Sequence, residues 1–209
     1  MRGGRALSRR GVVVGMRRFV IVGHRASTSP EFPLDDLAGG AGRMDLLLNA
    51  ANAALLVSHD LRRDSEITLM LLGPPDPPRA VRLVGARLQS FGPDVRTGAG
   101  LVRGALAAVS RVEREVAPGV FVARRGLAEV LESIPEPVIE LREGGKDIRE
   151  VGLPLHVAFV LSDTADLTGE EEAVVAGRRV AVCSVGPRSI HADHVIAIVH
   201  NELDRRYRA

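Results

Sequence analysis

The chain has 209 residues, of which 45% are hydrophobic and 26% charged, a balance typical of a globular protein large enough to bury a core. Its net charge is +2 and aromatic residues make up only 3% of it, which disfavours a protein that stacks many bases on aromatic rings. A single cysteine excludes an internal disulfide and a cysteine-based zinc site, and makes a reducing cytoplasm the expected compartment.

Residues 1–15 combine arginines with a Gly-Val-Val-Val-Gly run that hints at a signal peptide. Arg17 and Arg18 interrupt this apolar run, so it is too short for a signal-peptide core. No segment approaches the ~20 apolar residues that a membrane-spanning helix needs. We therefore interpret residues 1–15 as a disordered extension, or as residues upstream of a true start at Met16, and residues 16–209 as one domain.

The first half of the chain alternates apolar runs with amphipathic stretches. Arg18–Gly23 is a predicted strand, helical spacing of apolar residues predicts a helix from Arg43 to near Ser58, and Ile67–Leu72 is typical of a buried strand. The proline-rich residues that follow cannot continue this strand. Further on we expect a small hairpin in Ala80–Leu88 and a helix from Gly98 to about Glu115.

The second half continues with shorter elements of the same two kinds. In chain order we expect a strand at Val120–Val122, a helix at Leu127–Leu131, a strand at Val138–Leu141, a polar turn at Arg142–Lys146, a strand at Val157–Leu161, an acidic helix at Glu170–Ala176, a buried strand at Val180–Val182 and a helix from Ala192. Strands that alternate with helices predict an α/β fold with a mostly parallel sheet.

The loop Ser184–Ser189 is the candidate ligand site. It is built of small residues and one proline, it follows a strand, and it precedes a helix. This order leaves free backbone N–H groups beside a gap that a ligand can fill. Because ligands bind beyond the carboxyl ends of parallel strands, we expect three strand ends to meet there: the residues after Leu141, Leu161–Thr164 and Val182–Ser189.

Several longer phrases of the sequence resemble one family. They are Gly42–Leu47, Ser58–Asp64, Leu72–Pro78, His191–His194 and Ile198–Asp204. In this order and spacing they resemble the archaeal tRNA pseudouridine N1-methyltransferases, which belong to the SPOUT class of S-adenosylmethionine-dependent RNA methyltransferases. The resemblance extends from Arg17 to about Arg206, and it is specific at both ends and loose between Pro93 and Gly169.

The resemblance implies a fold, a cofactor and a substrate. The C-terminal segment would form a deep trefoil knot, with S-adenosylmethionine bound in a bent shape among the knot loops. The working unit would be a homodimer with the site at the subunit interface, and the substrate would be pseudouridine at tRNA position fifty-four, methylated on ring nitrogen N1. The cofactor contacts carried over are Leu141, Ser162, Ser184, Val185, Gly186, Pro187, Arg188, Ser189 and Val195.

Two of these cofactor positions depart from the family pattern. Archaeal members carry Gly where this chain has Ser162 and Cys where it has Val195, and they carry Cys-Arg-Cys in place of Leu48–Ala50. The departures indicate a bacterial-type branch. They leave three alternatives open: a methyltransferase for a different RNA, an RNA-binding protein that keeps the fold without methyl transfer, and an α/β enzyme that acts on a small molecule.

Methyl transfer to N1 of pseudouridine requires a group that accepts the N1 proton. Asp45 is the candidate, with Arg43 binding the base carbonyls or a phosphate. The structural alternative for Asp45 is an acidic residue in the first turn of a helix. Arg62 and Arg63 are candidates for phosphate contacts, with Asp64 orienting one of them, and the alternative is a solvated charge cluster.

His191 and His194 are three residues apart, which raises the question of a metal site. With Asp193 between them and a single cysteine in the chain, they do not form a recognised set of ligands. We expect these histidines to cap or flank the C-terminal helix, and we expect no metal.

Overall fold

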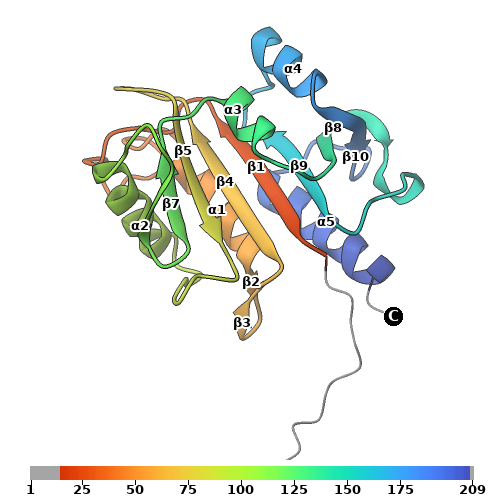
Figure 1. The fold of residues 1–209 in the computed structure, drawn as a ribbon, viewed down its shortest axis with the longest axis horizontal. Helices are drawn as coiled ribbons and strands as arrows, with labels where there is room; N and C mark the ends of the chain where they lie inside the picture. Colours follow the sequence, from red (N-terminus) through yellow and green to blue (C-terminus); the bar gives the residue numbers. More distant parts are fainter. Residues whose placement is uncertain (1–14, 208–209) are drawn as a thin grey trace, which may run out of the picture.

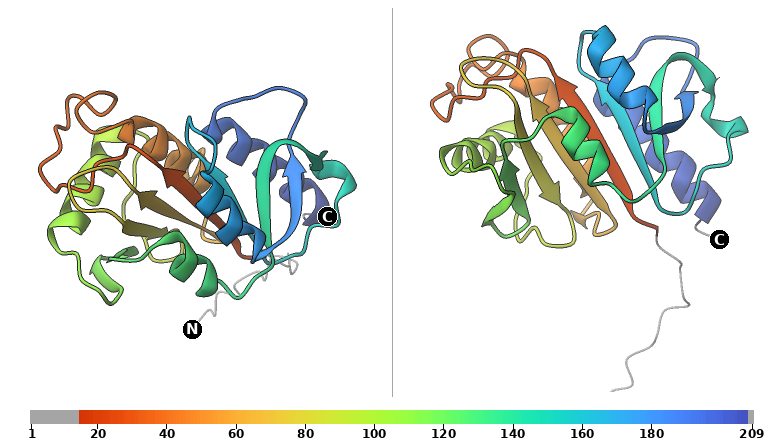
Figure 2. Two further views of the ribbon diagram at one scale, coloured as in Figure 1. Left: turned by 90° about the horizontal axis from the view of Figure 1, so that it is seen from above. Right: turned by 45° about the horizontal axis from the view of Figure 1, so that its top comes forward.

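The computed structural model describes residues 15–207, which form a central sheet between two layers of helices (Figures 1 and 2). The strands are β1 (Arg17–Gly23), β2 (Leu56–Val57), β3 (Asp60–Leu61), β4 (Ser65–Leu71), β5 (Arg79–Val84), β6 (Arg114–Ala117), β7 (Val120–Ala123), β8 (Val138–Asp147), β9 (Val157–Ser162) and β10 (Arg179–Ser184). The helices are α1 (Met44–Leu55), α2 (Val95–Ala107), α3 (Leu127–Glu132), the 3-10 turn η1 (Ile148–Glu150), α4 (Gly169–Ala176) and α5 (Ala192–Tyr207). Apart from Gly15, the expected extension at residues 1–15 lies outside the described residues.

The strands of the central sheet lie in the order β10-β8-β9-β1-β4-β5-β7-β6, and β2 with β3 forms a separate ribbon. From β10 to β4 the neighbours pair in parallel, whereas β5, β7 and β6 add an antiparallel extension. The prediction of an α/β fold with a mostly parallel sheet is confirmed. The carboxyl ends of the parallel strands all meet one edge of the sheet.

The middle strands are buried on both faces, which explains their near-continuous apolar sequences. Phe19 of β1 packs in the core with α1, α2 and α5, whereas its neighbour Val20 packs with α3 and α4 on the other face. Phe19 also stacks on Phe159 of β9, with ring centroids 5.5 Å apart. A one-residue slip would exchange the two faces, so this pattern fixes the register that pairs Val22 with Ser162.

The antiparallel side of the sheet departs from two predictions. Ala80–Leu88 contains no hairpin, because β5 is a single strand with β4 on one side and β7 on the other. The helix expected from Gly98 to Glu115 begins earlier, after the capping side chain of Asp94, and ends at Ala107. Residues 108–113 of the expected helix form an irregular connection, and its last two residues, Arg114 and Glu115, belong to β6. The β6–β7 hairpin turns at Gly119, which has a φ of 77°, and this pairing outweighs the helical spacing of the apolar residues.

The parallel edge of the sheet also differs from its predicted form. β8 continues through Arg142–Lys146, which the sequence predicts as a polar turn. In its ladder with β10, the partner changes from Glu140 to Lys146 over a single step of β10, so residues 141–145 bulge out of the ladder. β10 is the edge strand and the side chain of Val180 is 67% exposed, so the prediction of a buried strand there is wrong.

Helix α5 packs against α1 and holds the last part of the described chain on the sheet. The buried ring of His200 accepts a hydrogen bond from Arg17 at Nδ1 (3.0 Å) and donates from Nε2 to the carbonyl of Ala54 (3.1 Å). Arg206 donates to carbonyls of the connection between β8 and β9. Neither α5 nor any other helix within residues 15–207 has the length and hydrophobicity to cross a bilayer.

Candidate functional site

A cavity of about 640 Å³ lies at the edge of the sheet where β8, β9 and β10 end. Parallel α/β sheets bind ligands at this edge, and the volume is that of a small-molecule site. The lining comprises residues 140–143, residues 161–167, most of residues 184–195, Leu46 and Glu172. The three strand ends expected to meet therefore do so, around one cavity.

Most of the predicted cofactor-binding residues line this cavity. They are Leu141, Ser162, Ser184, Val185, Gly186, Arg188, Ser189 and Val195. Pro187, in the same loop as five of them, is not part of the lining. The fold thus brings together three segments that are distant in the sequence.

The loop between β10 and α5 arches away from the sheet edge, as the left view of Figure 2 shows. Ser184 stabilises its first turn, because its Oγ donates to the Gly186 carbonyl (2.6 Å) and accepts from the Gly186 N–H (3.2 Å). Ala192 and Asp193, the first residues of α5, belong to the cavity wall. Since the first N–H groups of a helix have no intrahelical partner, this wall offers backbone donors to a polar ligand.

The cavity wall carries more carboxylates than guanidinium groups. Its acidic residues are Glu140, Glu143, Asp163, Asp166, Glu172 and Asp193, and its arginines are Arg142 and Arg188. Glu140 is buried and pairs with Arg179 and with Arg142, the latter at 3.4 Å. The acidic excess suits a ligand with positive charge, such as the sulfonium and ammonium groups of S-adenosylmethionine. With the apolar side chains of Leu141 and Val195 for the adenine ring, the cavity fits this cofactor in size and chemistry.

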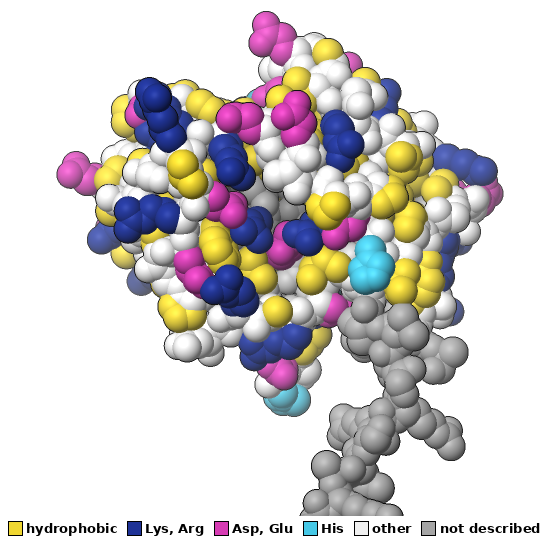
Figure 3. Space-filling model, viewed as in Figure 1, with side chains coloured by type: hydrophobic (Ala, Val, Ile, Leu, Met, Phe, Trp, Pro, Cys, Tyr) yellow, Lys and Arg dark blue, Asp and Glu magenta, His cyan; other side chains and the backbone are white. Residues whose placement is uncertain are grey.

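A second cavity, of about 190 Å³, lies on the face of the sheet that carries α3. Arg18 and Arg82 in its lining pair with Glu66, and Arg82 pairs also with Glu113. Figure 3 views this face and shows positive and negative side chains intermixed. Because Arg18, Arg82, Glu66 and Glu113 pair with one another and the volume is small, this cavity is the weaker candidate for a ligand site.

Beside the larger cavity, His24 bridges two carboxylates. Its Nδ1 lies 3.1 Å from Asp163 Oδ1, and its Nε2 lies 2.9 Å from Glu171 Oε2. Burial lowers the pKa of His24, but the two carboxylates outweigh burial and the pKa is raised above 6.5. The sequence predicts only a loop here. The available signal was position, because His24 directly follows Gly23, the last residue of β1, at the edge where the cavity opens.

Arg43 and Asp45 form a two-pronged ion pair at the start of α1. The distances are 3.1 Å from Arg43 Nε to Asp45 Oδ1 and 3.2 Å from Arg43 Nη2 to Asp45 Oδ2. Neither side chain lines the cavity, but Leu46 does, and the charge of Asp163 acts on Arg43. The pair therefore lies at the margin of the cavity.

Arg62, Arg63 and Asp64 lie at the amino end of β4, away from the cavity. The seven residues of β4 separate the two edges of the sheet by about 20 Å. Arg62 pairs with Asp204 at 2.8 Å, and Asp64 pairs with Arg17 at 3.6 Å. Arg63 donates to two backbone carbonyls. Each of the three residues thus has a partner within the protein, and none reaches the cavity.

Within residues 15–207, no group of three or more His, Cys, Asp or Glu side chains could hold a metal ion. His191 and His194 stack on each other, with ring centroids 5.9 Å apart. Cys183 is buried, and burial raises the pKa of its thiol. It therefore packs as a small core residue.

Comparison with known sequences relates the chain to methyltransferases. A family model described as "Putative SAM-dependent RNA methyltransferase" matches residues 16–207. The tRNA (pseudouridine(54)-N(1))-methyltransferase of Methanocella arvoryzae is 46% identical over 193 residues, which are 91% of this chain and 100% of that protein. The enzyme of the same name from Halobacterium salinarum is 41% identical over 193 residues, 90% of this chain and 96% of that protein.

Among solved structures, Archaeoglobus fulgidus Nep1 bound to S-adenosylhomocysteine has a similar fold. The TM-score is 0.60 over 92% of this chain and 98% of that chain, at 15% sequence identity. At this identity the likeness concerns the fold alone. The family match, in contrast, spans nearly all of the described residues. The chain is therefore a member of the S-adenosylmethionine-dependent RNA methyltransferase family.

Proposed function

We propose that the protein transfers the methyl group of S-adenosylmethionine to N1 of pseudouridine in tRNA, at position 54. The observation that carries the proposal is the 46% identity to a relative of that name along that relative's whole length. The acidic cavity at the carboxyl edge of the sheet supports it, because its size and charge suit the cofactor.

We assign cofactor binding to Leu141, Ser162, Ser184–Ser189 and Val195. The backbone of the Ser184–Ser189 loop and the start of α5 would donate hydrogen bonds to the cofactor, while the apolar side chains exclude water. When bound, the cofactor supplies an activated methyl group, so the protein mainly positions the two reactants.

We propose that Asp45 is the group that accepts the proton of pseudouridine N1. Its carboxylate would accept a hydrogen bond from N1–H and take the proton as the methyl group is transferred. Arg43 holds this carboxylate through two hydrogen bonds, which fixes its direction at the margin of the cavity. The target base would have to leave its stack in the tRNA to reach the cavity.

We also propose that Arg62, Arg63 and Asp64 contact RNA, but away from the cavity. Because these residues lie at the opposite edge of the sheet, they would contact part of the tRNA that is distant from the target base. Such contacts would position the RNA without reading its sequence.

We further propose that residues 16–209 form one domain, that its C-terminal segment is knotted, and that it works as a homodimer in the cytoplasm. The proposal of a knot rests on the family, and the bonds from Arg206 hold the end of α5 against the β8–β9 connection. Ile190 and Ile198 support the dimer, because both are large apolar side chains left more than one-third exposed near the cavity and on α5.

The test uses the purified protein, radiolabelled S-adenosylmethionine and two tRNA transcripts, one with uridine and one with pseudouridine at position 54. We expect label only in the second transcript, and nucleoside mass spectrometry should identify N1-methylpseudouridine. Label in neither transcript, from a protein that binds the cofactor in calorimetry, would sink the proposal. Equal label in both would redirect it to another nucleotide.

A further inference from the structure

His24 adds a side-chain link between the end of β1, the end of β9 and helix α4, beyond the direct pairing of β1 with β9. It follows β1, while Asp163 follows β9 and Glu171 lies in the first turn of α4. Both ring nitrogens face carboxylate oxygens, at 3.1 Å and 2.9 Å. A carboxylate only accepts hydrogen bonds, so both nitrogens must donate. With both carboxylates ionised, both contacts are hydrogen bonds only in the doubly protonated imidazolium form of His24, the form that the raised pKa of the ring favours.

The two carboxylates also hold the segment between them. Asp163 Oδ1 accepts from the N–H of Ala165 at 3.2 Å, and Glu171 Oε2 accepts from the N–H of Thr168 at 2.8 Å. Residues 163–167 line the cofactor cavity. The oxygen atoms of Asp163 and Glu171 that contact His24 therefore also hold the backbone at both ends of this part of the cavity wall.

The surroundings of His24 favour its charged form. Asp163 from the end of β9 and Glu171 from α4 are the charged groups of the described residues that act on it, and Arg43 at the start of α1 acts in turn on Asp163. Glu172, the next residue of α4, is held by Arg142 at 2.8 Å. The side chain of Asp163 is only 2% exposed, so water would poorly replace a lost partner.

We propose that His24 is a positioning residue for methyl transfer, which as an imidazolium between Asp163 and Glu171 fixes residues 163–168 as a wall of the cofactor cavity. It acts through this segment and does not touch the methyl group. The inference rests on the proposed function only in that the cavity holds S-adenosylmethionine. If His24 loses a proton, one ring nitrogen presents a lone pair to a carboxylate, and that carboxylate loses the contact that fixes it against β1, which loosens one end of the segment.

The pH dependence has a defined sign. The carboxylates raise the pKa of His24, so the bridge is complete below the ordinary value of 6.5 and is lost as the pH rises through the raised value. In a glutamine variant, His24→Gln, no ionisation remains at this position. The amide cannot donate on both sides, so the segment should be released at every pH.

Hydrogen–deuterium exchange of the cofactor-free protein between pH 5.5 and 9 tests the bridge, with rates corrected for intrinsic exchange. Amides of residues 164–168 should exchange about tenfold faster in His24→Gln at low pH, and only the wild type should show a step as the pH rises. Glu171→Gln keeps an acceptor for Thr168 but removes a charge, so its step should move to lower pH. His59→Gln, at an exposed histidine between β2 and β3, is the matched control and should behave as the wild type.

Calorimetry with S-adenosylhomocysteine supplies the second measurement. If only the ordered segment binds the ligand, the apparent Kd of His24→Gln at pH 6 should rise by the inverse of the fraction of molecules in which residues 163–168 stay ordered. Exchange and affinity equal to the wild type at every pH would overturn the proposal. These measurements need no RNA, so a failure to methylate tRNA would count against the proposed function and leave this result separate.

Discussion

The ion pair between Arg43 and Asp45 is the arrangement that most directly suits the proposed chemistry. Both residues lie in or next to the first turn of α1, and Arg43 has a left-handed φ of 67°. A non-glycine residue in this region is uncommon, and its cost of about 1 kcal/mol or more must be offset by the surrounding structure. Here it aims the guanidinium at Asp45, which supports a role beyond a charge at the start of a helix.

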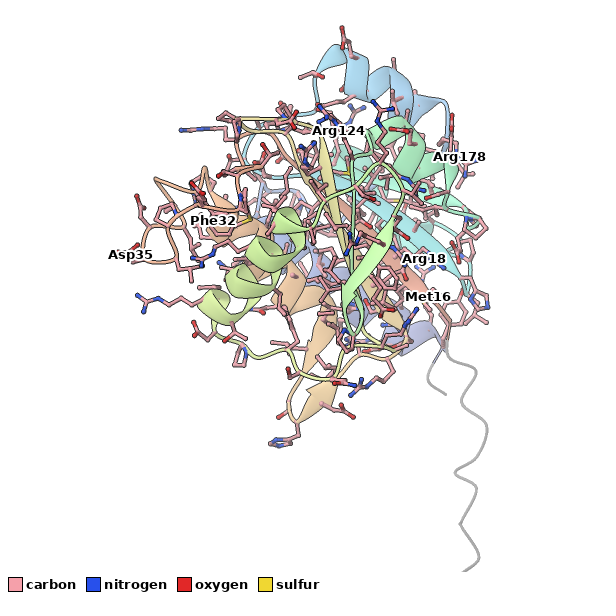
Figure 4. All side chains as sticks on the ribbon, turned by 60° about the vertical axis from the view of Figure 1, so that its left-hand side comes forward. Met16, Arg18, Phe32, Asp35, Arg124 and Arg178 are labelled. Carbon is pink, nitrogen blue, oxygen red and sulfur yellow. The ribbon has the colours of Figure 1, made fainter. Side chains whose placement is uncertain are left out.

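Replacement of Asp45 by asparagine should lower kcat for tRNA methylation about 10²- to 10⁴-fold, because the amide cannot take the N1 proton. Cofactor affinity in calorimetry should not change, since Asp45 does not line the cavity. Asp35→Asn is the control, because Asp35 is exposed and lies at the periphery of the molecule in Figure 4. Equal kcat in Asp45→Asn and the wild type would leave Asp45 with only the helix-start role.

His200 should make the protein sensitive to mild acid. Burial, followed by the charges of Arg62 and Arg17, lowers the pKa of its ring to about 3, so the folded protein keeps it neutral. An unfolded chain protonates this histidine below about pH 6.5. Stability should therefore fall as the pH drops from 6.5, with a slope from this group of up to about 1.4 kcal/mol per pH unit.

Urea unfolding between pH 7.5 and 4.5 measures this slope. His200→Gln can accept from Arg17 and donate to the Ala54 carbonyl, so it should fold with a flatter profile. Asp204 should add little to this slope. Its pKa is lowered to about 2, so its contribution to the free energy of unfolding is lost mainly at more acidic pH. A variant with the same slope as the wild type would show that other groups cause the acid sensitivity.

At the scale of elements, local sequence was enough where a strand or helix contacts the core along its whole length. The strands β1, β4 and β9 were predictable because both of their faces are buried, which gives near-continuous apolar runs, and the helix α1 because its buried residues recur at helical spacing. β6 was not, because it depends on pairing with β7 rather than on its own apolar spacing. The edge position of β10 likewise depends on sheet order, which no local pattern encodes.

The site was also predictable only in the parts that have a signal in the local sequence. The loop after β10 and the strand ends carry a local signal, because parallel strands place their carboxyl ends together. His24 lies 139 positions from Asp163, and Arg62 lies 142 positions from Asp204. Pairings over such separations are set by packing of the whole fold. Without them, His24 has no visible partner and Arg62 resembles a free cation.

Glycines offer a test of how the element α1 is held in place. A Cβ at Gly42, with φ of 64°, would lie 1.8 Å from the carbonyl oxygen of Arg25, so Gly42→Ala should destabilise the protein by about 1–3 kcal/mol or more. Gly100 is exposed on α2, and a Cβ there would meet no atom within 4 Å, so Gly100→Ala should stabilise by about 0.5–1 kcal/mol. Urea unfolding compares the two. Equal stability of Gly42→Ala and wild type would mean that the turn before α1 rearranges at little cost.

At the scale of the whole molecule, the two edges of the sheet differ in what they carry: one has the cavity and the other has a cluster of ion pairs. The carboxyl edge carries the cavity, with Asp163 held by His24. The amino edge carries an ion cluster in which Asp204 pairs with both Arg17 and Arg62. Helix α5 connects the two, because it begins in the cavity wall and carries Asp204 near its end. A contact made by α5 with a second subunit would therefore act on both edges.

Dimerisation through α5 can be tested with one pair of variants. Ile198 is 37% exposed on α5, and an aspartate there would place a charge in an apolar contact, so Ile198→Asp should yield a monomer by light scattering where the wild type is a dimer. Val112→Asp is the control, because Val112 is 73% exposed on the segment between α2 and β6 and should leave the dimer intact. If the cofactor cavity is completed at the interface, Ile198→Asp should also bind S-adenosylhomocysteine more weakly. A wild-type monomer that binds the cofactor normally would contradict the homodimer and leave the cavity of one chain as the complete site.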